Sequence, residues 1–498
     1  MKKPNLVFIQ NDHQAFFNHR PGSGARPLRP NFDRLCAEGA RFDNAYCVTP
    51  MCAPARRTML TGQYTHEHKQ YFNYCDSPFA QTYLEVLRQG GYENYYFGKW
   101  HAGKTDVLRR NAECFTCEGY GNPYTTPEYA AYCQRLGIEK AVHRVDWAFT
   151  MDQYEEANYW PKLKTGAAYS CEGTWCGEHA VGETITPKES HEAFFLADMA
   201  CRKLEQIKQE DSGRPFALRV DFWGPHQPFF PSAEFLHLYD EVDISPFGSL
   251  HADLAGKPDL YKIEWTVPFG EDNRLCQPTR ITEEQWAMIL KHVYAHITML
   301  DAAGGLIVDK LRQLGLDENT LIVWTTDHGD SIASNGGHFD KGSHMCEEVM
   351  RIPLAMRLDG TIPKGVVCEE LVNTVDLPVT LLDAAGLRFA QRRFGRSLLD
   401  IFRPGAPAWR QELLCEHMGH GYGEEHLSKM LRWKNYKLIY HHEQGQINEL
   451  YDLDRDSFEQ RNLYDDPAYG GVKALMLDKL RARLLETDDE LSHEAWIE

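Results

Sequence analysis

The stretch Thr320–Asp330, TLIVWTTDHGD, decides the fold class of this chain. Its apolar run from Leu321 to Trp324 shows no alternation with polar residues, and it stops at Thr-Thr-Asp-His. A short continuous run of this kind is typical of a strand buried on both faces, as in a parallel sheet. Because ligands bind beyond the carboxyl ends of such strands, Asp327 and His328 lie where chemistry is expected.

Three other apolar runs end in the same way. NLVFIQND ends at Asp12, YENYYFGKWH ends at Lys99 and His101, and FALRVDFWGPH ends at His226. If these runs are neighbouring strands of one sheet, their polar ends meet at one edge. The sequence therefore predicts one layer of chemically active side chains assembled from distant segments.

Helical patterns lie between these runs, the clearest over residues 189–209 and 282–315. The second is long, and we expect it to break near Gly304 and Gly305. Strands alternating with helices predict an α/β fold, in which helices sandwich a large, mostly parallel sheet.

Composition narrows the class of function. Of the 498 residues, 43% are hydrophobic and 25% charged, as in a globular protein with a sizeable core. The net charge of −19 argues against nucleic acid or an anionic membrane as a partner. No apolar run reaches the length of about 18 residues that suggests a membrane span. The N-terminus MKKPNLVFIQNDHQ shows no signal peptide, so we expect a cytoplasmic protein with reduced cysteines.

The pattern changes near Leu387, which suggests two domains. Residues 1–386 are expected to form the catalytic domain, with insertions near 105–186 and 229–278 that have no sustained periodicity. Residues 387–498 are expected to form a smaller α+β domain with an antiparallel sheet and a closing helix.

Cys52 stands at a predicted helix start. Pro54 suits a first helical turn, and the free N–H groups there favour an anion beside Cys52. Arg56, four residues on, carries a fork of donors that suits a tetrahedral oxyanion. Spacing alone leaves two readings open, because a cysteine at a helix start can also be a small buried hydrophobic residue.

CAPAR followed by RTMLTGQ resembles the sulfatase signature Cys-x-Pro-x-Arg with its trailing Leu-Thr-Gly. The resemblance continues in order through PNLVFIQND, GKWH, PHQPF, TTDHGD and a C-terminal YKLIY…ELYDLDRD, and so covers almost the whole chain. It implies an alkaline-phosphatase-like fold and a sulfuric ester hydrolase. It also implies that a maturation enzyme oxidises Cys52 to formylglycine, which serves as the nucleophile.

The resemblance assigns a role to each strand end. One divalent metal would be bound by Asp12, by Cys52 as formylglycine, and by Asp327 and His328. Calcium is the usual metal of the family, while manganese, magnesium and zinc stay open. The remaining catalytic roles fall to Arg56, which positions the formylglycine, His101, which contacts its diol, Lys99 and Lys341, which grip the anion, and His226, near the leaving oxygen.

These roles also make physical sense. A metal and two lysines hold the negative charge on the nonbridging oxygens, and a histidine can protonate the departing alkoxide. A geminal diol lets the covalent sulfate ester break at carbon, which a serine nucleophile does not allow.

Position 13 departs from the family pattern. Many sulfatases carry two consecutive aspartates here, whereas His13 follows Asp12 in this chain. If His13 and His328 both bind the metal, the site suits manganese or zinc better than calcium; a role beside the metal ligands or toward substrate is the other reading of His13. Phosphonate monoester and phosphodiester hydrolases also show a single aspartate and a later Asp-His pair, so they are the alternative function.

The substrate is expected to be a small-molecule or saccharide sulfate ester. Candidate pocket residues are His66, His68, Trp100 and Lys104, with Asp106 and the cluster at 417–426 as further candidates. An inactive anion-binding module is a remote alternative, because every catalytic position of the family pattern is filled.

Overall fold

The computed structural model describes residues 3–16, 24–75, 77–119, 121–148, 164–174, 180–244, 248–261, 281–338, 340–342, 344–419, 427–442 and 445–493. Its central feature is an eight-stranded sheet in the order β12-β2-β11-β10-β1-β9-β4-β5. These strands are β1 Asn5–Asn11, β2 Ala40–Phe42, β4 Glu93–Gly98, β5 Glu113–Phe115, β9 Phe216–Asp221, β10 Thr320–Thr326, β11 Leu354–Arg357 and β12 Val366–Cys368.

The middle of the sheet is parallel. β1 pairs in parallel with β10 on one side and with β9 on the other, and β9 continues in parallel to β4 and β5. β11 is antiparallel to both of its neighbours, β10 and β2. The four predicted runs are therefore the adjacent strands β10, β1, β9 and β4, and their carboxyl ends lie side by side.

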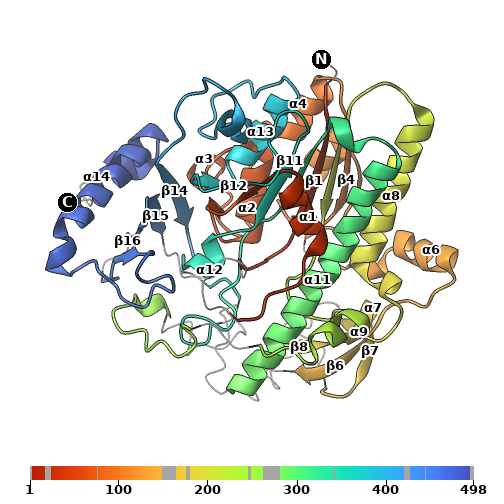
Figure 1. Cartoon of the computed structure of the whole chain (residues 1–498), viewed down its shortest axis with the longest axis horizontal. Helices are drawn as coiled ribbons and strands as arrows, with labels where there is room; N and C mark the ends of the chain where they lie inside the picture. The colour runs from red at the N-terminus through yellow and green to blue at the C-terminus, as the bar shows by residue number, and fades with distance from the viewer. Residues whose placement is uncertain are drawn as a thin grey trace.

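Helices cover both faces of this sheet (Figure 1). On one face pack α1 (Pro30–Glu38), α8 (Glu192–Glu210) and α11 (Glu283–Gln313). The other face carries α2 (Cys52–Thr61), α4 (Tyr83–Gln89) and α13 (Asp376–Ala384). Alternate strand residues enter the two cores: Val7, Ile9, Ile322 and Trp324 in the first, and Leu6, Phe8, Leu321 and Val323 in the second. The predicted sandwich is confirmed.

α11 runs unbroken through the two glycines at which a break was expected, so that prediction was wrong. A Cβ on Gly304 would lie 2.5 Å from the Trp324 ring, and one on Gly305 would lie 2.4 Å from Asn31. Both glycines therefore serve close packing of the helix on the sheet and on α1, rather than ending the helix.

A separate four-stranded antiparallel sheet follows in the C-terminal part of the chain, as the fold class required. It consists of β14 Glu412–His417, β15 Ser428–Trp433, β16 Tyr436–His441 and β17 Glu449–Asp452. Helix α14 (Gly470–Glu486) packs on it through Met476, Leu480 and Leu484. The boundary at residue 386 stays a prediction.

The first predicted insertion has ordered structure of its own. It contains α6 (Pro127–Leu136) and a three-stranded antiparallel sheet of β6 Val142–Ala148, β7 Ala168–Ser170 and β8 Ala180–Thr184. Of the second insertion, residues 262–278 lie outside the described residues.

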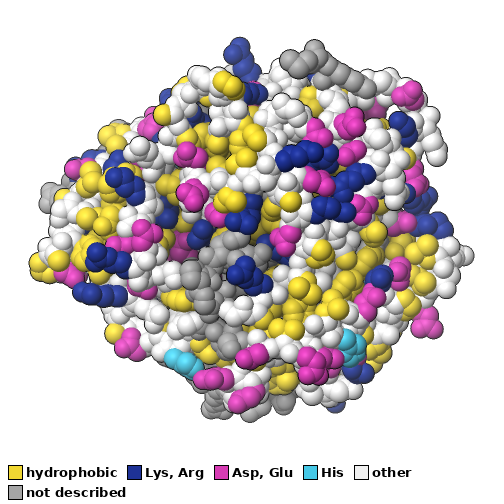
Figure 2. Space-filling view, in the orientation of Figure 1, with side chains coloured by type: hydrophobic (Ala, Val, Ile, Leu, Met, Phe, Trp, Pro, Cys, Tyr) yellow, Lys and Arg dark blue, Asp and Glu magenta, His cyan; other side chains and the backbone are white. Residues whose placement is uncertain are grey.

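Acidic and basic side chains are interspersed over the face seen in Figure 2, so the net charge of −19 forms no single acidic patch on that face. Among the described helices, none is both long enough and apolar enough to cross a membrane.

Candidate active site

The carboxyl ends of the four adjacent strands bring the predicted residues together. Asp12 follows β1, Lys99 follows β4, and Asp327 and His328 follow β10. All four side chains are buried, at 0% exposure. Gly98 allows the tight turn at the end of β4: its φ is 113°, and a Cβ there would lie 1.9 Å from the Asp221 carbonyl oxygen.

Cys52 is the first residue of α2, and its thiol faces His328. The Sγ lies 3.1 Å from His328 Nε2, while His328 Nδ1–H donates to the Gly329 carbonyl at 2.9 Å. Burial raises the pKa of the Cys52 thiol, but Lys341, Lys99 and His328 together hold it well below its usual value. Cys52 is therefore not an ordinary core thiol, because cationic groups surround it on several sides.

His328 responds to the same neighbours. Burial lowers its pKa, but Asp327 and Cys52 outweigh burial and raise it to about 9. Asp327 has a pKa raised to about 6 by burial and by the nearby charge of Asp12. Two buried carboxylates close enough to raise the pKa of one of them are groups that a cation would stabilise.

Arg56 ties the buried carboxylates together. Its Nε donates to Asp327 Oδ2 at 2.9 Å, its Nη2 to Asp12 Oδ1 at 2.8 Å, and its Nη1 to Asp221 Oδ2 at 3.0 Å. Nη1 also donates to the Lys99 carbonyl at 2.8 Å. The guanidinium that the sequence suggested for an oxyanion is thus engaged by protein carboxylates, and it positions metal-binding candidates instead.

Sequence reasoning missed Asp221. It ends β9 in the middle of the run FALRVDFWGPH, and the apolar residues after it hid the strand end. The sequence signal for Asp221 was a carboxylate inside an otherwise apolar run, because a buried carboxylate requires a partner.

The histidines and the second lysine complete the site. Burial lowers the pKa of His101 to about 4, although a hydrogen bond with Cys52 opposes that shift. His226 is partly buried, and its Nδ1–H donates to the Gln227 carbonyl at 2.9 Å. Lys341 Nζ lies 2.8 Å from Asp340 Oδ1. Burial lowers the pKa of His226, but a hydrogen bond with Cys52 opposes that effect, and the pKa is raised overall.

His13 takes a different direction from the metal-binding candidates. Its backbone N–H donates to Asp327 Oδ1 at 2.9 Å, but its Nε2 lies 3.0 Å from Asp340 Oδ1. Its ring packs edge-on against His226 and His328, with centroids 4.8 Å and 4.7 Å away.

Three donors form a group suited to a metal ion. Ligand atoms of Cys52, Asp327 and His328 lie within 4.8 Å of one another, and all three residues are buried. Asp12 lies next to this group, with its oxygens bound to Arg56 and Lys99. A carboxylate, an imidazole and the atom at position 52 are a donor set that fits a divalent cation.

The predicted substrate residues lie in other surroundings. His66 Nδ1 contacts Glu416 at 3.0 Å, and His68 Nε2 contacts the Thr58 hydroxyl at 3.1 Å. Trp100 is 1% exposed in the core and donates to the Gly103 carbonyl. Short helices and turns direct these three side chains inward, where they contact groups outside the layer of strand ends.

Three further candidates are partly described. Lys104 is exposed and Asp106 begins α5 (Asp106–Asn111). His417 Nε2 lies 3.4 Å from the Gly342 carbonyl, beside Lys341, whereas residues 420–426 of its cluster lie outside the described residues.

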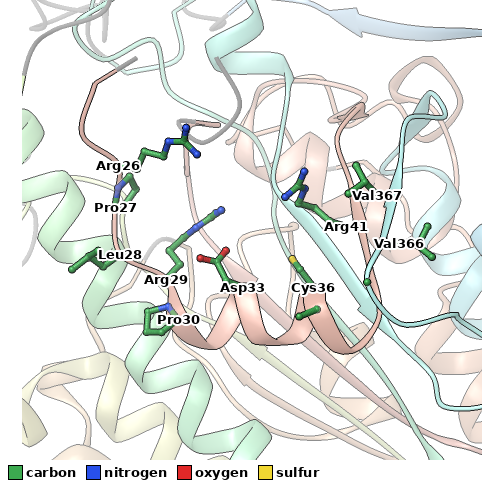
Figure 3. A pocket seen from close by; sticks show the side chains of 12 residues that line it. Arg26, Pro27, Leu28, Arg29, Pro30, Asp33, Cys36, Arg41, Val366 and Val367 are labelled. Atoms are coloured by element: carbon green, nitrogen blue, oxygen red, sulfur yellow. The ribbon is translucent and has the colours of Figure 1, made fainter. Parts of the chain in front are cut away.

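A hollow of about 770 Å³ lies away from these residues, between α1 and β12 (Figure 3). Arg26, Arg29 and Arg41 line it together with Asp33, and none of the predicted site residues does. The candidate active site is therefore the layer of strand ends and not this hollow.

The family follows from comparison with known proteins. Residues 4–387 match the family model described as Sulfatase, and residues 334–486 match a model described as N-sulphoglucosamine sulphohydrolase, C-terminal. The chain belongs to the sulfatase family. It is thus a sulfuric ester hydrolase of the alkaline phosphatase superfamily, and the family generally uses a metal and formylglycine.

Two relatives of this sulfatase differ in their described activities. It is 26% identical over 472 residues to a choline-sulfatase from Rhizobium meliloti, with 93% of this chain and 83% of the relative covered. It is 28% identical over 529 residues to the multifunctional alkaline phosphatase superfamily protein PehA from Trinickia caryophylli, with 99% and 98% covered.

Solved structures share the fold. A phosphonate monoester hydrolase from Silicibacter pomeroyi has a TM-score of 0.75 at 20% identity, covering 98% of this chain and 97% of that one. A structure in complex with D-glucosamine-2-N,6-O-disulfate has a TM-score of 0.72 at 21% identity, covering 99% and 100%.

Proposed function

We propose that this sulfatase hydrolyses sulfate monoesters of a small molecule or saccharide, using formylglycine made from Cys52 and one divalent metal. The observation that carries the proposal is the position of Cys52 at the first residue of α2, 3.1 Å from His328 and beside Asp327. The names of the relatives support the substrate class, because they include a choline-sulfatase and a structure holding a disulfated glucosamine.

The metal would be held by position 52, Asp327 and His328, with Asp12 beside them. It would supply positive charge to polarise the sulfate oxygens, and formylglycine would supply a hydroxyl nucleophile and an ester that breaks at carbon. Calcium, the usual metal of the family, stays the first candidate and manganese, magnesium and zinc the others, because His328 is a nitrogen donor of this group whereas His13 is directed at Asp340.

The chain's own residues would hold the charge that develops on the anion. Burial raises the pKa of Cys52, but the positive charges of Lys341 and Lys99 lower it, so the same two charges would stabilise an anion at this point. Arg56 holds the carboxylates of Asp12 and Asp327 in position, because it donates a hydrogen bond to each.

His226 would act on the leaving oxygen. Its Nδ1–H is fixed on the Gln227 carbonyl, so Nε2 is the nitrogen that can carry a proton to the departing group.

A phosphonate monoester hydrolase is the second candidate. The observation that favours it is position 13, where this chain has a histidine directed at Asp340 instead of a second carboxylate. The relative PehA, described as multifunctional, supports keeping this reading open.

The test compares paired aryl esters, a sulfate and a phosphonate, on enzyme co-expressed with a formylglycine-generating enzyme. Peptide mass would measure conversion at Cys52. We expect Cys52→Ala to abolish hydrolysis, whereas Cys133→Ala, at a buried cysteine of α6, should leave it unchanged. Near-normal activity of Cys52→Ala contradicts the formylglycine assignment, and a strong preference for the phosphonate selects the second candidate.

A further inference from the structure

Asp340 receives contacts from three different segments. Its Oδ1 lies 2.8 Å from Lys341 Nζ and 3.0 Å from His13 Nε2. Its Oδ2 accepts a hydrogen bond from Gln227 Nε2 at 3.2 Å. The residue is 6% exposed, so these partners replace water around the carboxylate.

Asp340 thereby connects the two sides of the site. Lys341 is the ammonium group for the anion, and Gln227 carries the carbonyl that accepts the Nδ1–H of His226. The loop itself is fixed at this point, because the backbone N–H of Ser331 donates to the Asp340 carbonyl at 2.9 Å. A shift of Asp340 would therefore displace both an anion-binding group and the group at the leaving oxygen.

His13 closes this arrangement from the side of β1. Its φ of 63° lies in the left-handed region, and its Nε2 also lies 3.5 Å from Asp330 Oδ2. The ring fills the space between His226 and His328 and faces two carboxylates, Asp330 and Asp340.

We propose that His13 and Asp340 form a positioning pair that orients Lys341 and Gln227 for catalysis. The proposal rests on the proposed function and explains why position 13 departs from the family pattern. An aspartate here would bring a third carboxylate toward Asp330 and Asp340, and buried like charges repel one another even with Lys341 beside Asp340. His13 thus contacts Asp340, the carboxylate that orients Lys341, rather than binding the metal.

The physical benefit is preorganisation. A lysine has four rotatable side-chain bonds, and fixing its ammonium group before the anion arrives avoids the entropy cost during reaction. Asp340 fixes the group, and His13 and Gln227 fix Asp340.

A double-mutant cycle tests this pair. We expect Asp340→Asn and His13→Leu each to lower kcat/KM by about 10²-fold, mainly through kcat, because misplacement by about 1 Å costs that much. The kcat/KM of the double variant should be no lower than that of the less active single variant, since the two residues act as a unit. His13→Gln keeps a donor for Asp340 and should retain most of the activity.

A second measurement does not depend on turnover. Inorganic sulfate should raise the melting temperature of the wild type, and this shift should shrink equally in Asp340→Asn, His13→Leu and the double variant. Asp301→Asn is the matched control: Asp301 is 2% exposed, and its carboxylate accepts the N–H of Asn31 and Phe32 in α1 rather than contacts from Lys341, His13 or Gln227. It should lose stability but keep the sulfate shift.

The outcomes separate the two proposals. Losses that multiply in the double variant, or a full sulfate shift in both single variants, overturn the positioning pair. A wild type that shifts with sulfate but cleaves neither ester overturns the proposed function, and the sulfate shifts of the variants still decide the pair. A wild type that does neither overturns both.

Discussion

Lys99 Nζ lies 2.5 Å from Asp12 Oδ2, and neither side chain is exposed to solvent. Lys341 and Asp340 form a second buried pair in the same site. Each lysine assigned to the anion is thus held by its own aspartate, and a buried ammonium without such a partner is costly. The site therefore contains both positive and negative side chains before any substrate binds.

Lys99→Met is expected to reduce both stability and turnover. Burial raises the pKa of Asp12, while Lys99 and Arg56 hold it well below its usual range, so loss of Lys99 leaves a buried carboxylate with one cation fewer. We expect kcat to fall about 10²–10³-fold, as when one stabilising donor is removed from an active site. Melting temperature and kinetics of the folded fraction measure the two effects.

Lys437→Met is the matched control for Lys99→Met. Lys437 is also fully buried and lies 2.7 Å from Glu459 and 3.2 Å from Glu347, two carboxylates that are not metal or anion candidates. It should lose stability without losing kcat. Equal kcat losses in the two variants would show that Lys99 acts only through stability.

Arg56→Lys tests the residue that joins three carboxylates. A lysine is a point charge and cannot donate to Asp12, Asp221 and Asp327 at once, as the guanidinium does. We expect the free energy of unfolding to fall by about 3–5 kcal/mol, the cost of breaking a buried ion pair. Urea unfolding measures it.

The control for this change is Arg432→Lys. Arg432 is 4% exposed and donates to the Tyr46 hydroxyl and to two backbone carbonyls, so its replacement strands no carboxylate of the site. Activity per folded molecule should survive in Arg432→Lys and be lost in Arg56→Lys. Survival in both would remove Arg56 from the active-site framework.

His226→Ala should discriminate between leaving groups. Because His226 is the candidate proton donor to the leaving oxygen, its loss matters most where that oxygen is a poor leaving group. We expect about 10²–10⁴-fold slower hydrolysis of alkyl or sugar sulfates and a much smaller effect on activated aryl sulfates. A Brønsted plot over a series of aryl esters measures the difference, and equal losses along the series would refute the role.

Sequence reasoning located the ends of β1, β4 and β10, because a buried run followed by Asp, Lys or His leaves few physical alternatives, but it missed the end of β9 at Asp221. It could not find Asp340 or Gln227, because both lie in loops that only the folded chain brings together. It placed His66 and Trp100 among the pocket candidates because they lie next to core motifs in the sequence, His66 after the signature and Trp100 within GKWH. The structure directs both into packed surroundings, since proximity along the chain does not fix the face on which a side chain lies.

His66 offers a test of pH-dependent stability away from the catalytic residues. It contacts Glu416 at 3.0 Å and Asp489 at 3.3 Å and joins α3 (Thr65–His68) to the C-terminal part. Burial lowers the pKa of His66, but Glu416 outweighs burial and raises it above the ordinary value of 6.5. Its contribution to stability is therefore complete below 6.5 and disappears as pH rises through the raised pKa.

The measurement compares the melting temperatures of the wild type and His66→Gln at about pH 6 and about pH 9, values on either side of the histidine titration. The difference should be larger at the lower pH. His143→Gln is the control with the opposite sign: burial lowers the pKa of His143 to about 3, so its protonation in the unfolded chain costs stability at the lower pH. An effect of His66→Gln that is the same at both values would contradict the charged His66–Glu416 pair.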